Sequence, residues 1–379
     1  MAERYDVIIA GLGAMGSAAA FHLARRGLRV LGLDRHTPPH ELGSSHGESR
    51  VIREAYFEHP AYVPLVQRAY ELWAELEEQT GQKLLRITGA LMLGTPEREV
   101  VTGALRSAQL HDLPHERLAA GEVRRRFPVL HPSPDQVGVY EPRAGVLFPE
   151  ACIQAHLDGA RAHAAALRFA EPLTRWRPTG EGVEVLTPWD RYHADALVLA
   201  VGAWLPGLMP WLPLEVARQV LHWLRPARDA EAFAPERCPV FLWETAPGRI
   251  FYGIPDLGGG VKVALHHGGE RSPLEQVRRE VGEEEVAAVR GLLDQYVPAA
   301  AGELLRSSVC LYTNTPDGHF LIDRHPEHPA VWLASPCSGH GFKFSGAIGE
   351  LLAQRITEGT SPLDSPLFRL ERLDLREKG

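Results

Sequence analysis

The first residues of the chain alternate between short apolar runs and glycine-rich turns. Tyr5–Ala10 is a β-branched apolar run, typical of a strand buried in a parallel sheet. The alanine-rich stretch Ser17–Arg26 predicts a helix, and Gly27 suits its C-terminal cap. A second apolar run, Leu28–Leu33, predicts the next strand. The pattern is that of one βαβ unit.

Helical and strand patterns continue along the chain without a repeat or a linker. Apolar residues recur at helical spacing from residue 59 to residue 79, which predicts an amphipathic helix. A capping box with proline at the first helical position predicts another helix beginning at Ser272–Glu275. The other predicted elements are helices over 151–166 and 346–357 and strands over 196–204, 240–245, 250–254, 260–266 and 331–334.

The turn of the N-terminal unit carries a GxGxxG fingerprint. Gly11 and Gly13 allow a tight turn and close approach of a pyrophosphate, and Gly16 begins the helix whose N-terminus stabilises that charge. Asp34 ends the second strand, 18 residues after Gly16, where a carboxylate accepts hydrogen bonds from ribose hydroxyls. An acid at this position favours FAD or NAD over a 2′-phosphorylated dinucleotide, although the neighbouring Arg35 weakens that inference.

The fold class follows from what comes after this unit. An NAD-dependent dehydrogenase would continue with further βα units, whereas this chain enters a mixed region at about residue 84. We therefore expect an α/β and α+β protein, with a Rossmann-like FAD-binding domain interleaved with a substrate domain built on a mixed or antiparallel sheet. The expected FAD-binding domain comprises residues 1–83, 145–215 and 310–379, and the substrate domain comprises 84–144 and 216–309.

Composition and charge exclude several classes of function. A net charge of −8 argues against a nucleic-acid-binding protein, which needs a basic face. No apolar run reaches the length of a membrane span, and the N-terminus has no signal-peptide pattern, so we expect a cytoplasmic protein without a membrane partner. The cysteines Cys152, Cys238, Cys310 and Cys337 are scattered, which argues against a disulfide framework and a cysteine-based zinc site.

Lysine is rare here. It occurs only at Lys83, Lys262, Lys343 and Lys378, although lysine and arginine total 40. A lysine retained within an apolar strand or beside a glycine-rich loop therefore calls for a chemical explanation.

Several longer segments are more specific than the fingerprint. They are GLGAMG, PPHELGSSHGESRVIREAY, GVLFPE, ALVLAVGAW, FYGIP, the strand around Lys262, SSVCLYTNTPDGHFLID and SGHGFKFS. In these segments the whole chain resembles the monomeric sarcosine oxidase and N-methyl-tryptophan oxidase group of flavin amine oxidases. The resemblance implies FAD as cofactor, a small anionic amino acid and O2 as substrates, and a monomer.

The resemblance also implies roles for single residues. Cys310 matches the position of a thioether link to the flavin, although a lone cysteine on an apolar strand is more often a buried hydrophobe. Lys262 matches the site of oxygen activation, where a positive charge stabilises superoxide. Arg53 and Lys343 would hold the substrate carboxylate, the alternative being a structural ion pair.

The remaining candidate residues lie beside the flavin or line the substrate pocket. Arg50 and His46 share a loop that we expect to border the flavin and its oxygen site. Tyr252, His266 and Tyr312 match positions lining the substrate pocket. The expected catalytic residues are Lys262, Arg50, His266, Tyr252 and His46, and Tyr312 joins Arg53 and Lys343 in binding substrate. The expected cofactor-binding residues are Gly11, Gly13, Ala14, Met15, Gly16, Asp34, Arg35, Ser44, Arg50, Cys310, Gly339, Gly341, Phe342 and Lys343.

Two structural expectations accompany these assignments. Gly339 and Gly341 open the last helix, whose N-terminus would face the flavin ring. His266 and His267 are adjacent in a predicted strand and should point to opposite faces, so we expect no metal site.

Other functions remain open at this stage. The same fold would serve N-methyltryptophan, pipecolate, proline or a glycated amino acid, and Trp243 either narrows the pocket towards sarcosine or points elsewhere. A dehydrogenase with a protein electron acceptor, a flavin-binding module without catalysis and an NAD-dependent enzyme are the rivals of other classes. Lys262 argues against the dehydrogenase, and the filled site positions argue against the inactive module.

Overall fold

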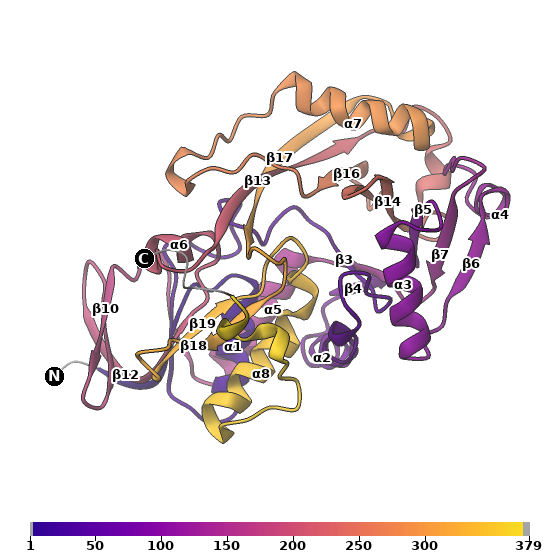
Figure 1. Ribbon diagram of the computed structural model, residues 1–379. Helices are drawn as coiled ribbons and strands as arrows, with labels where there is room; N and C mark the ends of the chain where they lie inside the picture. The colour runs from indigo at the N-terminus through magenta and orange to yellow at the C-terminus, as the bar shows by residue number, and fades with distance from the viewer. Residues whose placement is uncertain (1–2, 374–379) are drawn as a thin grey trace.

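The computed structural model describes residues 3–373, which form two large sheets, a small sheet and their covering helices (Figure 1). The first sheet has the strand order β10-β11-β12-β1-β2-β9, and β18 and β19 extend it beside the second half of β12. Its strands are β1 (Arg4–Ala10), β2 (Val30–Leu33), β9 (Ala166–Arg168), β10 (Arg175–Thr179), β11 (Gly182–Leu186), β12 (Arg191–Leu199), β18 (Leu321–Arg324) and β19 (Val331–Ser335). The central pairs of β1 with β2 and with β12 are parallel, as the βαβ pattern predicts.

Three helices cover one face of this sheet (Figure 1). They are α1 (Ala14–Ala24), α5 (Pro149–Ala162) and α8 (Ser345–Glu358). Val7 and Ile9 of β1 point into the core beneath these helices, while Ile8 points into a separate core on the other face. Because both faces are covered, β1 is a continuous apolar run. The predicted cap is wrong: α1 ends at Ala24 with Arg25 as its C-cap, and Gly27, with a φ of +85°, lies in the turn that follows.

The second large sheet has the order β17-β13-β16-β15-β14-β5-β7-β6. Its strands are β5 (Ala90–Gly94), β6 (Glu116–Ala119), β7 (Val137–Glu141), β13 (Glu215–Leu224), β14 (Val240–Ala246), β15 (Arg249–Ile254), β16 (Val261–His266) and β17 (Leu304–Asn314). Helix α7 (Glu283–Tyr296) lies along one face, and α3 (Glu99–Leu110) and α4 (Ala120–Arg126) lie at the β5–β7 end (Figure 1).

Side chains of the second sheet alternate between its two faces. Trp243 and Phe251 belong to the core that contains the apolar side of α7, whereas their neighbours Leu242 and Tyr252 line a cavity on the opposite face. This period of two gives the sheet one structural face and one face available for a site.

A small sheet and a long helix connect the two large sheets in sequence. The small sheet pairs β3 (Arg50–Ile52), β8 (Gly145–Leu147) and β4 (Leu85–Ile87). Helix α2 (Val63–Thr80) is amphipathic as predicted, and it contacts α8. The loop between β3 and α2 lies close to the cavity, and Arg53 and Glu58 of this loop line it.

The structure corrects three predicted elements. No long helix begins at Ser272: its hydroxyl donates to the carbonyl of Pro273, and only a single 3-10 turn, Leu274–Gln276, follows. The long helix is α7, whose first turn carries three glutamates and whose Glu285 carboxylate accepts a hydrogen bond from the Gly282 N–H.

The helix predicted over 151–166 ends at Ala162, because Ala164 adopts a φ of +65° and the chain then enters β9. The strand predicted over 196–204 ends at Leu199 and is followed by a 3-10 turn over Gly202–Trp204. The boundary expected between residues 309 and 310 falls inside β17, which pairs with β13 along its whole length.

Among residues 3–373, no helix is both long enough and apolar enough to cross a membrane.

Candidate active site

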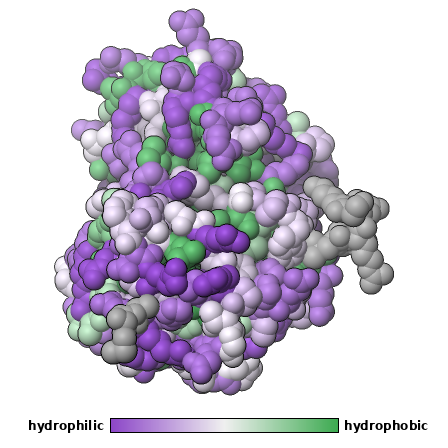
Figure 2. All heavy atoms as spheres, turned by 90° about the vertical axis from the view of Figure 1, so that its left-hand side faces the viewer, coloured by the Kyte–Doolittle hydropathy of each residue, from purple (hydrophilic) through white to green (hydrophobic). Residues whose placement is uncertain are grey.

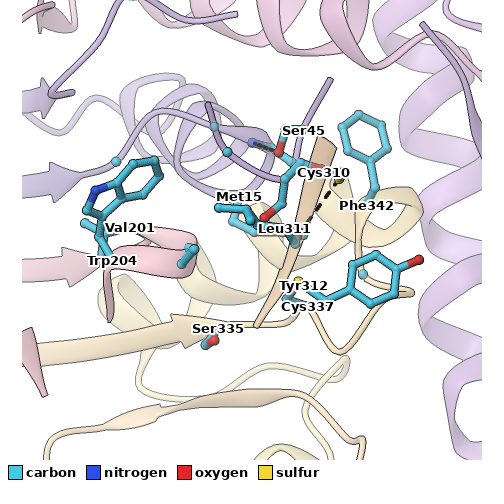
Figure 3. Close-up of a pocket in the computed structure, with 18 of the residues that line it drawn as sticks. Met15, Ser45, Val201, Trp204, Cys310, Leu311, Tyr312, Ser335, Cys337 and Phe342 are labelled. Atoms are coloured by element: carbon cyan, nitrogen blue, oxygen red, sulfur yellow. Dashed lines mark hydrogen bonds between the residues drawn. The ribbon is translucent and has the colours of Figure 1, made fainter. Parts of the chain in front are cut away.

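A cavity of about 850 Å3 lies where the carboxyl ends of β1, β2 and β12 meet the open face of the second sheet. Figure 3 shows Val201 and Trp204 towards one end, Tyr312 and Phe342 towards the other, and Cys310 between them. The carboxyl ends of parallel strands are the usual location of ligand sites in open α/β sheets. The cavity therefore joins the predicted nucleotide loop to the predicted substrate residues.

The glycine loop has the geometry of a pyrophosphate cradle. Gly11 has a φ of +87°, and a Cβ on Gly16 would lie 1.7 Å from the Gly11 carbonyl oxygen. The N-cap residue Gly13 has no side chain to cap α1, and the first N–H, that of Ala14, makes only a long hydrogen bond of 3.4 Å to Ser45 Oγ, so the N-terminus of the helix offers N–H groups to a ligand. Asp34 closes this loop, because its carboxylate accepts the N–H groups of Leu12 at 2.7 Å and His36 at 2.8 Å.

Further observations show that the cavity suits FAD. The Oγ atoms of Ser44 and Ser335 are buried without a partner among the described residues, and both serines line the cavity. They offer hydrogen bonds to a polar cofactor. Arg35 lies over the Trp204 ring at 5.3 Å, at the same end of the cavity as Asp34. Gly13, Ala14 and Met15, which the sequence analysis expects to bind the cofactor, also line it.

Cys310 and Arg50 lie side by side on the cavity wall. The Cys310 Sγ is 3.4 Å from Arg50 Nη2, and the thiol donates to the Ser44 carbonyl at 3.6 Å. Arg50 also donates to the Ser44 and Ser49 carbonyls at 2.9 Å, which fixes its guanidinium beside the sulfur. The Arg50 guanidinium, held in this position, would stabilise negative charge on a cofactor ring in the cavity.

Arg53 and Lys343 come together at the substrate end, and both line the cavity. Arg53 donates to both carboxylate oxygens of Glu58 at 2.6 Å, and its guanidinium lies over the Tyr56 ring. Lys343 donates to the His340 carbonyl at 2.6 Å. The two predicted cations, Arg53 and Lys343, therefore lie at one site. In this structure Arg53 forms an ion pair with Glu58 of its own loop.

Burial and charge set the protonation of this cluster. Burial, reinforced by the nearby Arg53 charge, lowers the pKa of Lys343 to about 7. Burial opposes ionisation of Glu58, but the nearby positive charges, that of Arg53 foremost, and the hydrogen bond from Arg53 together outweigh it and hold the Glu58 pKa at about 2. Burial lowers the pKa of His340 to about 3, so this imidazole is neutral.

The loop that carries Arg53 is anchored from β7. The carboxylate of Glu141 accepts the N–H groups of Glu54 at 2.6 Å and Ala55 at 2.8 Å. Burial raises the pKa of Glu141 to about 7. This acid thereby fixes the backbone next to the Arg53 guanidinium.

Three aromatic side chains also line the cavity. Tyr252, His266 and Tyr312 line the cavity, and His266 Nδ1 lies 3.4 Å from the Tyr312 hydroxyl. Burial, with a further contribution from His267, lowers the pKa of His266 well below its ordinary value. Burial raises the pKa of Tyr252 to about 12. These three side chains are therefore uncharged at neutral pH.

The prediction that His266 and His267 point apart is wrong. Strand β16 ends at His266, His267 adopts a φ of +65°, and the two imidazole centroids lie 4.2 Å apart. Among residues 3–373, no group of three or more potential ligands could hold a metal ion.

Lys262 is buried and is not among the residues that line the main cavity, although its ammonium group bonds Ser49, which does line it. Its Nζ donates to the carbonyls of Gly47 and Ser49 at 2.8 Å and to the Ser49 hydroxyl at 3.2 Å. Burial, with the charge of Arg50, lowers the Lys262 pKa well below its usual range. His46 is also buried but does not line the cavity, and burial lowers its pKa to about 3.

Two positions before the C-terminal helix require glycine, because neighbouring groups lie too close to leave room for a Cβ atom. Gly339 has a φ of +80°, and a Cβ there would lie 2.5 Å from the Tyr312 ring. A Cβ on Gly341 would lie 1.6 Å from the Pro336 carbonyl oxygen. A 3-10 turn over Phe342–Phe344 precedes α8, so the predicted glycine turn leads into the helix through this turn.

Sequence reasoning missed two polar groups of the site. Glu58 follows Arg53 by five residues. An acid so close in sequence to a candidate carboxylate-binding arginine could have indicated that the two side chains form an ion pair. The hydrogen bond of 2.5 Å between His340 Nδ1 and the Tyr56 hydroxyl joins residues distant in sequence, so no local pattern marks it. Trp243 points away from the site into the α7 core.

Comparisons with known proteins agree with this geometry. The model of the DAO family, FAD dependent oxidoreductase, matches residues 6–355. Monomeric sarcosine oxidase from Streptomyces avermitilis is 46% identical over 98% of this chain and 99% of its own length. N-methyl-L-tryptophan oxidase from Yersinia pestis is 35% identical over 97% of this chain and 99% of its own length. The structure of NikD, an unusual amino acid oxidase essential for nikkomycin biosynthesis, matches with a TM-score of 0.83 and 25% identity, covering 97% of each chain.

Proposed function

The chain belongs to the family of FAD-dependent oxidoreductases, and we propose that it oxidises small N-methyl amino acids such as sarcosine with O2. The observation that carries this proposal is one cavity that holds a nucleotide cradle, Cys310 with Arg50, and the buried cations Arg53 and Lys343. FAD bound in this cavity would supply the acceptor for a hydride from the amine and the two electrons that reduce O2.

The cations bind and orient the substrate. Its carboxylate would replace the Glu58 carboxylate on Arg53 and accept a hydrogen bond from Lys343, since both side chains face the same end of the cavity. Tyr252, Tyr312 and the neutral His266 would surround the amine without adding positive charge. Burial among these uncharged groups disfavours the ammonium form, so the amine would release its proton to solvent on binding, and its lone pair would assist hydride loss.

The overall reaction balances without a further reactant. Sarcosine loses a hydride from carbon and a proton from nitrogen, and O2 gains both electrons and two protons to become H2O2. Water then hydrolyses the imine, so sarcosine, O2 and water give glycine, formaldehyde and H2O2.

Three finer statements belong to this proposal. Cys310 would attach covalently to the flavin, supported by its place on the cavity wall 3.4 Å from Arg50. Lys262 would assist oxygen reduction, because a negative charge in the cavity favours its protonated form. The protein would act as a monomer, like the relatives whose names include that word. The cytoplasmic location expected from the sequence stays a prediction.

A substrate panel tests the proposal. Oxygen uptake and peroxide release should be largest in kcat/KM with sarcosine or another small N-methyl amino acid, and smaller with N-methyltryptophan, pipecolate, proline or a glycated amino acid. A protein that reduces its flavin with one of these substrates but transfers electrons only to a dye would be a dehydrogenase. FAD-loaded protein that is reduced by none of them would refute the proposal.

A further inference from the structure

Tyr56, His340 and Lys343 form a buried polar group in which only Lys343 has a role in the reaction described above. Hydrophilic residues predominate on the face of the molecule shown in Figure 2, where water can take up their hydrogen bonds. The side chains of this group are instead 0%, 7% and 5% exposed, so their polar atoms have to bond one another. The protein itself therefore decides which atoms donate and which accept.

The hydrogen bonds of this group run in one direction. His340 Nε2 lies 3.0 Å from the Gly318 carbonyl, which can only accept, so Nε2 carries the ring proton. Burial keeps the imidazole neutral, and its Nδ1 is thus left as the acceptor for the Tyr56 hydroxyl at 2.5 Å. The hydroxyl has a single proton, so its oxygen accepts from Lys343 Nζ at 3.4 Å. We call this sequence from Lys343 through Tyr56 and His340 to Gly318 the Tyr56 chain.

The backbone of His340 takes a second donor of the lysine. The His340 carbonyl lies 2.6 Å from Lys343 Nζ and 3.3 Å from the Tyr56 hydroxyl, so the lysine is the better placed donor. The other contacts of Nζ are with ring faces, those of Tyr56 and Phe344, each with its centroid 5.1 Å away. Because Lys343 lines the main cavity, the third N–H of its ammonium group remains for a ligand there.

The far end of the Tyr56 chain is held by the turn between β17 and β18. Gly318 has a φ of +74° in this turn. Arg372 donates to the Asp317 carboxylate at 2.8 Å and to the His319 carbonyl at 2.9 Å. These contacts on both sides of Gly318 fix the carbonyl that selects the tautomer of His340.

The charged groups around Lys343 act in opposite directions. Burial and the charge of Arg53 disfavour the ammonium form, whereas the carboxylate of Glu58 favours it. The Tyr56 ring contacts both cations, with the Arg53 guanidinium 4.3 Å from its centroid. As a hydrogen-bond acceptor, the Tyr56 oxygen adds to the groups that favour the ammonium form.

We propose that Tyr56 and His340 are positioning residues for Lys343: the Tyr56 chain holds its ammonium group and leaves one N–H for the carboxylate of the substrate. His340 acts through Tyr56, because it takes the only proton of the hydroxyl and so makes the oxygen an acceptor for the lysine. The inference rests on the proposed function and deepens it by naming the residues that keep Lys343 a donor.

The pH dependence of butyrate binding to the FAD-loaded protein tests this role. Butyrate is a carboxylate without an amine, and its binding perturbs the flavin spectrum. Tyr56→Phe keeps the ring beside both cations and removes only the hydroxyl, which should lower the pKa of Lys343 by about one unit. The Kd of the variant divided by that of the wild type should then be about one at pH 5 and about ten at pH 8. The titration of Glu141 cancels in this ratio, because its contacts are the same in both proteins.

Tyr62→Phe is the matched control. Tyr62 is buried in the same aromatic group, its ring centroid lies 5.0 Å from that of Tyr56, and its hydroxyl contacts His319 and the Phe320 N–H instead of the lysine. The Kd ratio of this variant should stay at about one from pH 5 to pH 8. Flavin absorbance per protein verifies that every variant is loaded with FAD.

Variants of His340 test whether it acts through Tyr56. His340→Leu frees the Tyr56 proton to compete with Lys343 for the carbonyl of residue 340, so the Kd at pH 8 should rise while the Kd at pH 5 stays unchanged. In the Tyr56→Phe background the same substitution should add no further rise. His340→Asn, which retains an acceptor for the hydroxyl, should restore most of the wild-type profile.

A Kd ratio for Tyr56→Phe that is equal at pH 5 and pH 8 would overturn the proposal, because a purely structural role changes binding uniformly. Additive effects of Tyr56→Phe and His340→Leu, or a rise at pH 8 in Tyr62→Phe, would overturn it as well. A wild-type flavin that responds neither to butyrate nor to any N-methyl amino acid would refute the proposed function itself.

Discussion

The protonation of Lys343 should control carboxylate binding near pH 7, a range that it shares with Glu141, the anchor of the Arg53 loop, so the Lys343→Met profile is needed to separate the two groups. Burial and the charge of Arg53 lower the Lys343 pKa to about 7, so the free enzyme carries a neutral amine here above that pH. The Glu58 and His340 pKa values lie at about 2 and 3, and that of Tyr252 at about 12. Butyrate, which replaces the amine of sarcosine by a methylene, isolates the carboxylate contact from substrate ionisation.

The magnitude follows from the charge pair that butyrate would form. A carboxylate about 4 Å from the ammonium, at an effective dielectric constant of about 20, favours the charged form by about 4 kcal/mol. That energy raises the Lys343 pKa in the complex by about three units. The Kd of butyrate should therefore increase about tenfold per pH unit between pH 7 and pH 9.

Perturbation of the flavin spectrum on butyrate binding measures this Kd. In Lys343→Met the Kd at pH 6 should be larger than that of the wild type by roughly two to three orders of magnitude, and it should not change between pH 6 and pH 9. Lys83→Met is the control, because the Lys83 side chain is 73% exposed and should leave the wild-type profile intact. A wild-type Kd that changes by less than about twofold from pH 7 to pH 9 would refute the reasoning.

Four further substitutions test other parts of the site. Glu58→Gln leaves Arg53 buried without its charged partner and should lower the free energy of unfolding by about 3 kcal/mol. Added butyrate should restore part of this loss in equilibrium denaturation, and an unchanged stability would contradict the pairing. Cys310→Ala should leave the flavin in the supernatant after acid precipitation, whereas a yellow pellet from this variant would place the covalent link elsewhere. Gly16→Ala places a Cβ 1.7 Å from a loop carbonyl oxygen and should abolish FAD retention, measured as flavin absorbance per protein. Glu141→Gln weakens the anchor of the loop and should raise the KM for sarcosine about tenfold with kcat little changed, and a loss confined to kcat would argue against a positioning role.

Local sequence signals predicted those parts of the fold that depend on local physics. The strand, glycine turn and helix from Tyr5 to Ala24 were predictable because apolar runs and positive-φ glycines act within a few residues. The same local reasoning failed at Ser272, where Pro273 and an extended backbone at Val277 allow only a short turn. It also failed at His267, whose positive φ no residue pattern indicates.

The site could be predicted only as a set of separate residues. The resemblance placed Arg53 and Lys343 at one substrate end, and the structure brings both to the same cavity. Glu58 was not predicted, because its pairing with Arg53 depends on the course of the loop between them. The separation of Lys262 from the main cavity was likewise beyond the sequence, since it results from how the loop carrying Ser49 packs on β16.

The most direct test of the oxidase assignment is the product stoichiometry of the purified protein with sarcosine in air. The proposal predicts one H2O2, one formaldehyde and one glycine for each O2 consumed, as the balanced equation requires. Glycine and formaldehyde formed without peroxide, and only when a dye or protein acceptor is present, would contradict it.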